Sequence, residues 1–532
     1  MKNLAKYTCL IALLAVGVRA QAQADVTLYH MKDLPHNNQL NPAFQPKNGS
    51  AYVNFPIAFN LGASIYGKGL TAETVLNMDK GGSIGTIPKK DAAFQADFSA
   101  AMPLSFGFMV RDMHFSFDMQ LKVHAEGRVP VGLMNLAWYG NGAPETLGKQ
   151  LSLEGLGVTA YAYGEVALGF SKEILKNSEL TDNGKNKMVV GGKLKYLQGA
   201  AYVQANLGED SYIHTDKDKY HITASVDPEV YVSGIKPDTS TLEGVFKALE
   251  NIDYMDFLKN ITKNRGVAID LGGTWDMPYD LSWNETPRKM TVSASLLDVG
   301  FIRWHGTSLT NTAKDKRIVF DGFDMSNGGF LDGLQDSVMQ RVDLTVKDGT
   351  FTKWLAPTMY LGANYHLFKY LNAGALVGFK FNKYETLPFF ALSANSQHFP
   401  LINGSTSFSY YNGHGNIGFG LLLGRKGFQM HLITDNLLTT NYKTAQSATF
   451  RMGMNFLLGR HEGKRKARIE ERKNRNAMPA TPDGDVTPDS PQEEPAVDTG
   501  ATSMSKEDLL KKALAEEAAE REDELMKKKK TS

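Results

Sequence analysis

Hydrophobic and polar residues alternate strictly over residues 114–126 of this chain. Because side chains of a strand point alternately to its two faces, the stretch predicts a β-strand with one apolar and one polar face. Such a strand suits a barrel wall between lipid and a watery lumen. The apolar row is Phe115, Phe117, Met119, Leu121, Val123 and Ala125. We expect the lumen-facing side chains to include Asp118, Gln120, Lys122, His124 and Glu126.

Similar patterns recur along the chain and predict about fifteen strands. Single-chain bacterial barrels close with even strand numbers, so we expect roughly fourteen strands and one misassigned segment. Pro56 weakens the first of these strands. The predicted strands lie near residues 52–59, 94–110, 113–127, 156–171, 188–206, 220–232, 267–277, 290–304, 359–367, 371–381, 389–396, 406–411, 417–423, 428–434 and 448–458.

The connections between these strands fall into two kinds. Residues 367–370 and 424–427 are short enough for tight hairpins, whereas residues 129–153, 233–265 and 305–357 make long connections. Barrels usually place short turns in the periplasm and long loops outside the cell. The strand directions implied here do not all agree with that rule, so at least one predicted boundary is wrong. The middle connection has helical spacing at Leu242, Val245, Phe246, Leu249 and Leu258.

The amino-terminal residues 1–24 have the pattern of a secretory signal. Lysines precede an apolar run, and Ala22-Gln23-Ala24 offers a small-residue cleavage site. Arg19 lies late in this segment, so the sequence does not fix the cleavage position within residues 20–24. Cys9 lies too early for a lipid anchor. Residues 25–50 are polar and rich in turn residues, which predicts an irregular lead-in or plug before the barrel of residues 51–459.

Past residue 459 the composition changes. Residues 460–478 are basic and could meet anionic headgroups at the periplasmic leaflet, although a solvated charged helix explains them equally well. Residues 479–504 are rich in Pro, Asp, Thr and Glu, which predicts a disordered linker. Residues 505–532 begin with a Ser505/Asp508 capping pattern and end in lysines, which predicts a charged helix. Its narrow apolar stripe could dock on a partner. We favour a solvated single helix.

Composition and motifs give no support for an enzyme. The only cysteine lies in the signal, so the mature chain can form neither disulfides nor thiolate metal sites. The balance of 58 basic and 57 acidic residues gives no nucleic-acid footprint. We find no nucleophile elbow, zinc-protease motif or phosphate-binding loop, and the histidines lack metal spacing. We therefore expect no catalytic residues, cofactor or metal. No apolar run after the signal approaches the ~20 residues of a membrane helix.

Two carboxylates interrupt otherwise apolar strands. Asp270 and Asp298 could face the lumen and pair there with Arg303 or line a binding pocket. The alternative is that they satisfy backbone donors at a bend next to glycine, with no ligand involved. We favour this structural interpretation, because ionisable groups inside membranes are usually paired within the protein.

Four strings of the sequence resemble an uncharacterised family of Bacteroidota outer-membrane proteins that is known only as a domain of unknown function. They are residues 28–44, 266–273, 293–304 and, together, 434–436 and 450–453. The family resembles, remotely, the long-chain fatty-acid channel and the shuttle barrel of type IX secretion. This resemblance implies an even-stranded barrel of roughly fourteen strands. It implies no functional residues, since none is established for the family.

The sequence therefore predicts an all-β protein, a transmembrane antiparallel barrel with a helical carboxyl-terminal tail, in the outer membrane of a Gram-negative bacterium. We expect a conduit or binding site for a hydrophobic or amphipathic small molecule, with outer-membrane lipid around the wall. The alternative is a non-transport scaffold whose tail recruits a periplasmic or secretion partner. A secreted soluble β-protein is a third possibility, but it would need a second sheet to cover every apolar row.

Overall fold

A computed structural model describes the chain from Asp25 to Leu458, and all these residues belong to one compact unit. The predicted signal and the regions 460–478, 479–504 and 505–532 lie outside the described residues. Further gaps are residues 47–50, 55–60, 70–89, 102–104, 177–185, 219–220, 235–261, 280–287, 313–316, 321–343, 369, 397–398, 400, 412–413, 425–426 and 438–446. No helix in the described part is long and apolar enough to span a bilayer.

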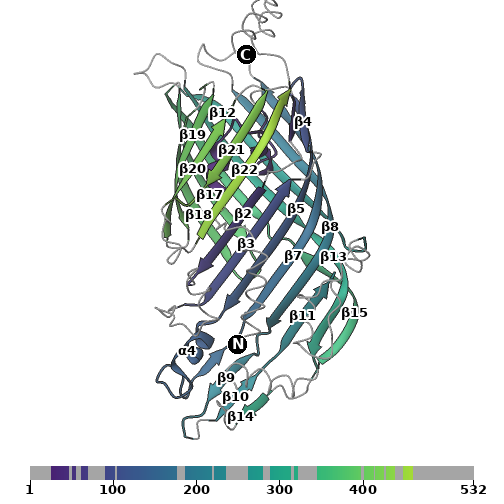
Figure 1. The fold of residues 1–532 in the computed structure, drawn as a ribbon, viewed down its shortest axis with the longest axis vertical. Helices are drawn as coiled ribbons and strands as arrows, with labels where there is room; N and C mark the ends of the chain where they lie inside the picture. The colour runs from purple at the N-terminus through teal and green to yellow at the C-terminus, as the bar shows by residue number, and fades with distance from the viewer. Residues whose placement is uncertain are drawn as a thin grey trace, which may run out of the picture. The chain divides into compact units, whose positions relative to one another are not determined.

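The strands close into an antiparallel barrel of 14 strand positions (Figure 1), which confirms the predicted fold and strand number. The last strand pairs with both segments of the first, so the described wall has no open edge. Positions with one strand are β5 Met113–Val129, β7 Gly157–Lys176, β8 Lys187–Leu207, β13 Arg288–Asn311, β17 Leu371–Phe381, β18 Thr386–Ser396, β19 Ile402–Tyr411, β20 His414–Leu423, β21 Phe428–Thr434 and β22 Ser447–Leu458. Positions with two successive segments are β1 Ala51–Asn54 with β2 Leu61–Lys68, β3 Ala92–Ala101 with β4 Phe106–Val110, β11 Pro228–Ser233 with β12 Arg265–Tyr279, and β15 Leu344–Trp354 with β16 Thr358–Phe368.

At three of the interrupted positions the sequence has a proline between the two segments. Pro357 lies between β15 and β16, and the sequence has Pro56 between β1 and β2 and Pro103 between β3 and β4. Proline has no amide N–H to donate to the ladder, so a strand that contains it is interrupted or placed at an edge. The predicted strand near residues 94–110 is therefore two segments.

The predicted strand at residues 220–232 is wrong as a single barrel strand. Its first part belongs to β10 (Ile222–Ser225) of a separate small sheet, and its second part is β11. β11 and β12 both pair with β8 and with β13, so they share one barrel position. The sequence analysis also missed β15, which lies inside the predicted long connection 305–357.

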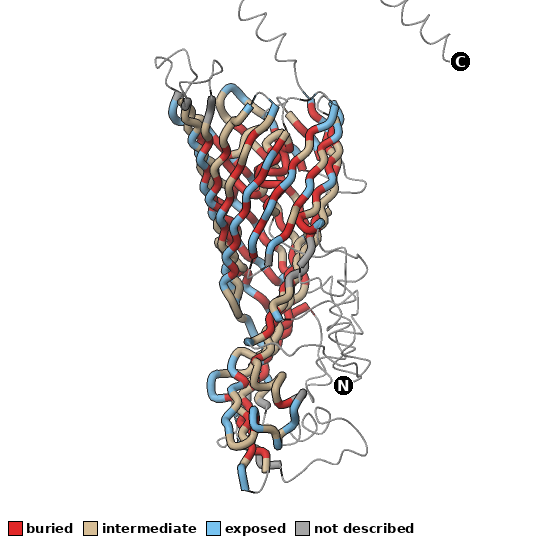
Figure 2. The backbone as a smooth tube through the Cα atoms, turned by 90° about the vertical axis from the view of Figure 1, so that its left-hand side faces the viewer, coloured by how far each residue is buried: buried red, intermediate tan, exposed pale blue. Residues whose placement is uncertain are grey.

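The wall has the two faces that the alternation predicts. Along β5 the polar row is buried, including His114 and Ser116, while Leu121 and Val123 on the other row are exposed. Figure 2 shows buried and exposed residues alternating along the strands. Large outward side chains such as Leu168 and Leu194 are each 61% exposed. A soluble sandwich would cover these side chains, so the structure contradicts that third possibility.

With the corrected strands, the four longest connections between neighbouring strand positions all lie at one end of the barrel. Residues 111–112 and 424–427 turn at the end where β1 begins and β22 ends. Residues 130–156 and 208–227 connect strands at the other end. The inconsistency in the predicted strand directions therefore came from counting residues 220–232 as a barrel strand of its own.

A small second sheet is built from the connections at the long-loop end. It consists of β6 (Gln150–Ser152), β9 (Tyr212–Thr215), β10 and β14 (Arg317–Phe320), and helix α4 (Val131–Tyr139) contacts β6. Its buried side chains include Leu136, Leu153, Ile213 and Ile222. The predicted helical spacing at Leu242, Val245, Phe246, Leu249 and Leu258 falls outside the described residues.

The amino-terminal residues 25–46 lie inside the barrel, and we call them the plug. The plug contains the short helix α2 (Val26–His30) and the 3-10 helix η1 (Pro35–Gln39). Nearly every residue from 26 to 43 is buried. Leu28 and Tyr29 pack against inward-facing residues of β16 to β21 in the largest apolar cluster of the barrel interior.

Candidate functional site: a lumen closed by a plug and a turn

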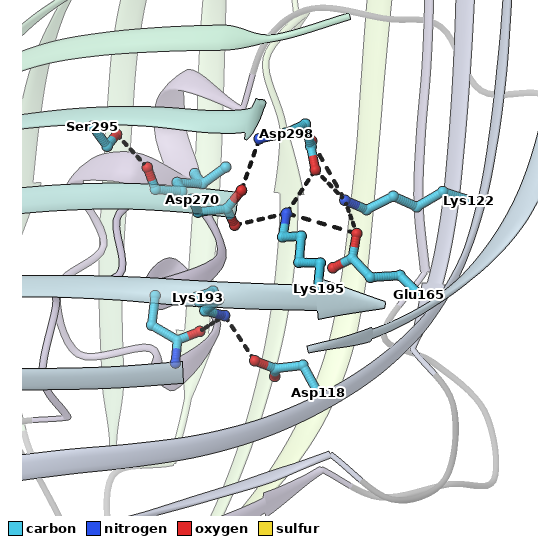
Figure 3. Close-up of polar contacts among 10 residues, drawn as sticks. Asp118, Lys122, Glu165, Lys193, Lys195, Asp270, Ser295 and Asp298 are labelled. Carbon is cyan, nitrogen blue, oxygen red and sulfur yellow. Dashed lines mark hydrogen bonds and ion pairs between the residues drawn. The ribbon is translucent and has the colours of Figure 1, made fainter. Parts of the chain in front are cut away.

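Five charged side chains from five strands meet in the lumen (Figure 3), and we call them the central ion cluster. They are Lys122 of β5, Glu165 of β7, Lys195 of β8, Asp270 of β12 and Asp298 of β13. The Lys195 ammonium lies 2.6 Å from Oδ2 of Asp270, 2.6 Å from Oδ1 of Asp298 and 3.6 Å from Oε2 of Glu165. The Lys122 ammonium lies 2.8 Å from Glu165 Oε2 and 3.2 Å from Asp298 Oδ1.

A β-bulge in β13 brings Asp298 into this cluster. Leu297 and Asp298 lie together opposite the single residue Asp270 of β12, where the pairing register shifts. Asp298 has a φ of 57°, which a short polar residue tolerates better than most, and its N–H donates to Oδ1 of Asp270 at 2.7 Å. The carboxylate of Asp270 thus satisfies a backbone donor at a bend, as the structural interpretation predicts.

Arg303 faces outward, so the expectation that it lines the lumen is wrong, and it cannot pair there with Asp270 or Asp298. Asp298 and Arg303 are five positions apart on β13, and an odd separation on a regular strand places side chains on opposite faces. Beyond the bulge the inward residues are Ile302 and Trp304, which are buried, whereas Arg303 is exposed and donates to Thr350. Lysines from β5 and β8 neutralise Asp298 instead.

A second buried ion pair joins the wall to the plug. The Lys193 ammonium lies 2.7 Å from Oδ2 of Asp118 and donates to Oδ1 of Asn38 in the plug at 3.1 Å. Lys193 and Asp118 are 3% and 2% exposed, so water contributes little to their solvation. The hydrogen bonds inside this site must therefore supply most of the stabilisation that water would give.

Other plug residues bind the wall on all sides. Thr27 donates its N–H to Oδ1 of Asp435 at 3.0 Å. Tyr29 donates to Ser293 at 3.0 Å, and His30 Nδ1 lies 3.0 Å from Oδ1 of Asn364. Asn41 donates to the Ala294 carbonyl at 3.1 Å. Asp25 forms an ion pair with Arg451.

Two of the small cavities in the described part of the chain lie between the plug and the wall. One of about 10 Å³ is lined by His36, Gln120 and His431 among others, and one of about 20 Å³ is lined by His30 and Asn395 among others. A cavity needs roughly 10–15 Å³ to hold one water molecule. Each of these spaces has room for about one water molecule and none for an organic ligand.

The turn between β17 and β18, residues 382–385, closes the lumen toward the long-loop end. It contacts the opposite wall, because β17 and β18 face β3 to β8 across the barrel. Asn382 donates to Gln95 at 2.5 Å, Lys383 donates its N–H to Oε2 of Glu126 at 3.0 Å, and the Tyr384 hydroxyl lies 3.2 Å from that of Thr159. Burial lowers the pKa of Lys383 to about 8.

His124 belongs to the same closure. Its Nδ1 lies 2.6 Å from Oδ1 of Asp97, and the ammonium of Lys380 on β17 lies 2.6 Å from the other oxygen of that carboxylate. Glu126 Oε1 lies 3.5 Å from His124 Nε2. Two residues of the alternating row on β5 thus hold the turn in place.

Aromatic side chains fill the lumen beside this turn, and we call them the aromatic cluster. They are Tyr161, Tyr163, Tyr202, Trp304 and Phe351. The rings of Tyr202 and Trp304 are 5.2 Å apart, and those of Tyr202 and Phe351 are 5.5 Å apart. The ammonium of Lys353 lies 3.5 Å from the centre of the Tyr231 ring at the edge of the cluster. This is a second apolar surface of the lumen, separate from the larger apolar cluster that packs against the plug.

The structure places Asp118, Gln120, Lys122, His124, Glu126, Asp270 and Asp298 inside the lumen. Sequence reasoning missed Glu165, Lys193 and Lys195, although β7 and β8 alternate as β5 does and could have been analysed in the same way. It also missed Arg451 and the plug contacts, which no local pattern reveals. Among the described residues, no group of three or more His, Cys, Asp or Glu side chains could hold a metal ion.

Comparison with family models identifies the chain. The model described as "Family of unknown function (DUF5723)" matches residues 42–435. The chain belongs to the DUF5723 family. This membership confirms the predicted resemblance to an uncharacterised family. The DUF5723 match spans the barrel from the plug to the end of β21. The search of curated proteins gives no match.

Solved structures of barrels are similar to this DUF5723 chain at low identity. The toluene transporter TbuX of Ralstonia pickettii is 10% identical, with a TM-score of 0.38, and the match covers 80% of this chain and 94% of that one. A deletion mutant of the TodX monoaromatic hydrocarbon channel is 8% identical, with a TM-score of 0.36, and the match covers 82% and 94%.

Proposed function

We propose that this protein is an outer-membrane β-barrel that binds and conducts a hydrophobic or amphipathic small molecule, and that the structure is its closed state. The observation that carries the proposal is the aromatic cluster, an apolar surface inside the lumen between two non-covalent closures. A partly apolar ligand binds most favourably at a site where buried aromatic rings lie next to a few polar groups.

The outward face of the wall supports the outer-membrane location. Exposed side chains such as Leu168, Leu194, Leu271 and Phe408 form an apolar band on both sides of the barrel. A monomer in water rarely exposes so many large apolar residues. The short connections would lie in the periplasm and the small sheet outside the cell.

Both closures can open without breaking a covalent bond. The turn is held by hydrogen bonds and by the ion pairs Lys380–Asp97 and Lys68–Glu385. The plug is held by hydrogen bonds and ion pairs to the lumen wall. Movement of the turn would expose the aromatic cluster from outside, and movement of the plug would connect it to the periplasm.

The proposal is tested by mass spectrometry of the purified protein together with conductance in planar bilayers. We expect a bound lipid or other amphipathic molecule, lost when Phe351→Ala and Tyr202→Ala open the aromatic cluster. The matched control is Phe408→Ala, an outward side chain on β19, which should retain the ligand. Repeated absence of any ligand, with conductance typical of a water-filled pore, would contradict the proposal.

A second candidate function is a non-transport scaffold that recruits a periplasmic or secretion partner through the carboxyl-terminal tail. The observation that favours it is the end of β22 beside β1, at the short-turn end, from which the tail would enter the periplasm. Photo-crosslinking from Leu514 or Leu525 in cells should then capture one specific protein. Deleting residues 504–532 should abolish the phenotype of the intact protein while the barrel still assembles.

A further inference from the structure

A buried carboxylate at the start of the plug has one oxygen without a partner. Asp435, just after β21, has no exposed surface. Its Oδ1 accepts hydrogen bonds from both the N–H and the hydroxyl of Thr27. Its Oδ2 is buried and has no hydrogen-bond partner among the described residues. An unmatched buried carboxylate oxygen costs about 1–3 kcal/mol or more, so a missing partner is expected.

The local charge is also unbalanced. Asp25 and Asp435 bring two carboxylates, and Arg451, which forms the ion pair with Asp25, brings one positive charge. Burial raises the pKa of Asp435 to about 7, which reflects the lack of a close counter-ion. One further positive charge beside Asp435 would balance this buried group.

The backbone nitrogen of Asp25 is a nearby candidate to carry that charge. Asp25 is the N-cap of α2, and the N–H of Thr27, two residues later, already contacts Asp435. One helical turn rises about 5.4 Å, so the nitrogens of residues 25 and 27 lie within roughly that distance. In the uncut chain this nitrogen is a neutral amide. In a chain that starts at residue 25 it is an α-ammonium group.

We infer that the leader is cut between Ala24 and Asp25, and that the new α-ammonium group docks on Oδ2 of Asp435 and locks the plug in the barrel. In the cut, signal peptidase adds water across the peptide bond. The hydroxyl goes to the Ala24 carbonyl carbon, and the freed amine of Asp25 takes up protons to become an ammonium. Plug docking is therefore completed by removal of the leader.

The direct test measures the reactivity of the α-amine in the mature, detergent-purified protein. Mass spectrometry of the amino-terminal peptide should give Asp25 as the first residue. An amine-reactive acylating reagent at pH 7 favours the α-amine over lysine. We expect labelling at least about tenfold slower in the folded protein than after denaturation. Asp435→Asn should restore fast labelling, whereas Ser407→Ala, which removes only the neutral partner of the Thr27 hydroxyl, should not.

A second pair of variants separates this role from simple capping of α2 by Asp435. Insertion of Gly-Ser after Ala24 keeps the cleavage motif but moves the ammonium two residues away. Asp435→Asn should lower the thermal midpoint of the normal mature chain but have little further effect in the extended chain. A mature start other than Asp25, fast labelling in the folded protein, or equal loss of stability in both backgrounds would overturn the inference.

Discussion

At the scale of single residues, one extra residue in β13 decides which charges face the lumen. Without the bulge at Leu297 and Asp298, regular alternation would turn Asp298 outward and Arg303 inward. With it, Asp298 joins two lysines in the lumen and Arg303 contacts solvent. The sequence offers the cue of an aspartate two residues before Gly300, but it does not show which of two neighbouring residues is inserted.

The central ion cluster depends on Lys195 more than on any other member, since its ammonium contacts all three carboxylates. Lys195→Met should destabilise the barrel by about 3–5 kcal/mol, because it leaves Asp270 buried without its lysine partner. Arg303→Met is the matched control and should change stability by less than about 0.5 kcal/mol. The check is urea unfolding of each variant in detergent micelles. Equal effects of the two changes would place both side chains in the same environment and contradict the cluster.

At the scale of elements, the plug approaches the wall at glycines. A Cβ atom added to Gly272 of β12 would lie 2.1 Å from Oδ1 of Asn41, and one added to Gly191 of β8 would lie 2.6 Å from the Pro42 carbonyl oxygen. No side chain fits between plug and strand at these positions. Neighbouring Gly273 has no such contact, since its nearest atom is 3.9 Å away.

Gly272→Leu should therefore displace the plug, whereas Gly273→Leu, on the outward face, should not. We expect the first variant to show larger and more frequent conductance steps in planar bilayers and faster proteolysis of residues 25–46. The second should match the unmodified protein. If Gly272→Leu leaves both measurements unchanged, the plug does not dock on β12 as described.

The two buried histidines of the plug should weaken its docking as the pH falls. Burial, with the charges of Arg451 and Lys193, lowers the pKa of His36 to about 3, and burial lowers that of His30 to about 4. In the released plug both would have pKa values near ~6.5, so the released state binds more protons between roughly pH 6.5 and 4. Each pKa unit corresponds to about 1.36 kcal/mol.

The measurement is the rate of plug proteolysis at pH 7.5 and at pH 5, with an acid-tolerant protease calibrated on denatured protein. We expect faster cleavage at pH 5. His36→Phe keeps a ring but cannot titrate, so it should reduce this difference, with His30 supplying the rest. An identical pH response in the His36→Phe variant would show that His36 does not control docking.

At the scale of the whole molecule, the alternation of apolar and polar residues was enough to predict the barrel, its strand number and the polar lumen. β17 and β21 match their predicted bounds, because each is a regular strand that follows a tight turn. The prediction failed where a strand is interrupted, as at β11 and β12, and where a strand such as β15 lies within a long connection. The plug contacts join residues hundreds of positions apart, and local patterns carry no information about such pairs.

The two faces of β8 should tolerate a lysine differently. A lysine on the inner face is stable, whereas one on the outer face should destabilise the barrel. Lys193 and Lys195 are accommodated inside the lumen, whereas Leu194 between them is 61% exposed on the outer face. Leu194→Lys should lower the free energy of unfolding by about 2–4 kcal/mol if that face lies at the bilayer midplane. The control Lys172→Leu, on the outer face near the end of β7, should change it little. Stability measured in lipid vesicles checks this. No cost for Leu194→Lys would mean that the outer face meets water.

A closed barrel in the outer membrane is tested most directly by electrophoresis of membrane fractions with and without boiling. We predict that the protein is recovered with the outer membrane and that the unboiled sample migrates differently from the boiled one, because a closed, fully hydrogen-bonded sheet resists detergent. Recovery as a soluble periplasmic or secreted protein, with the same mobility before and after boiling, would contradict the barrel and the proposals built on it.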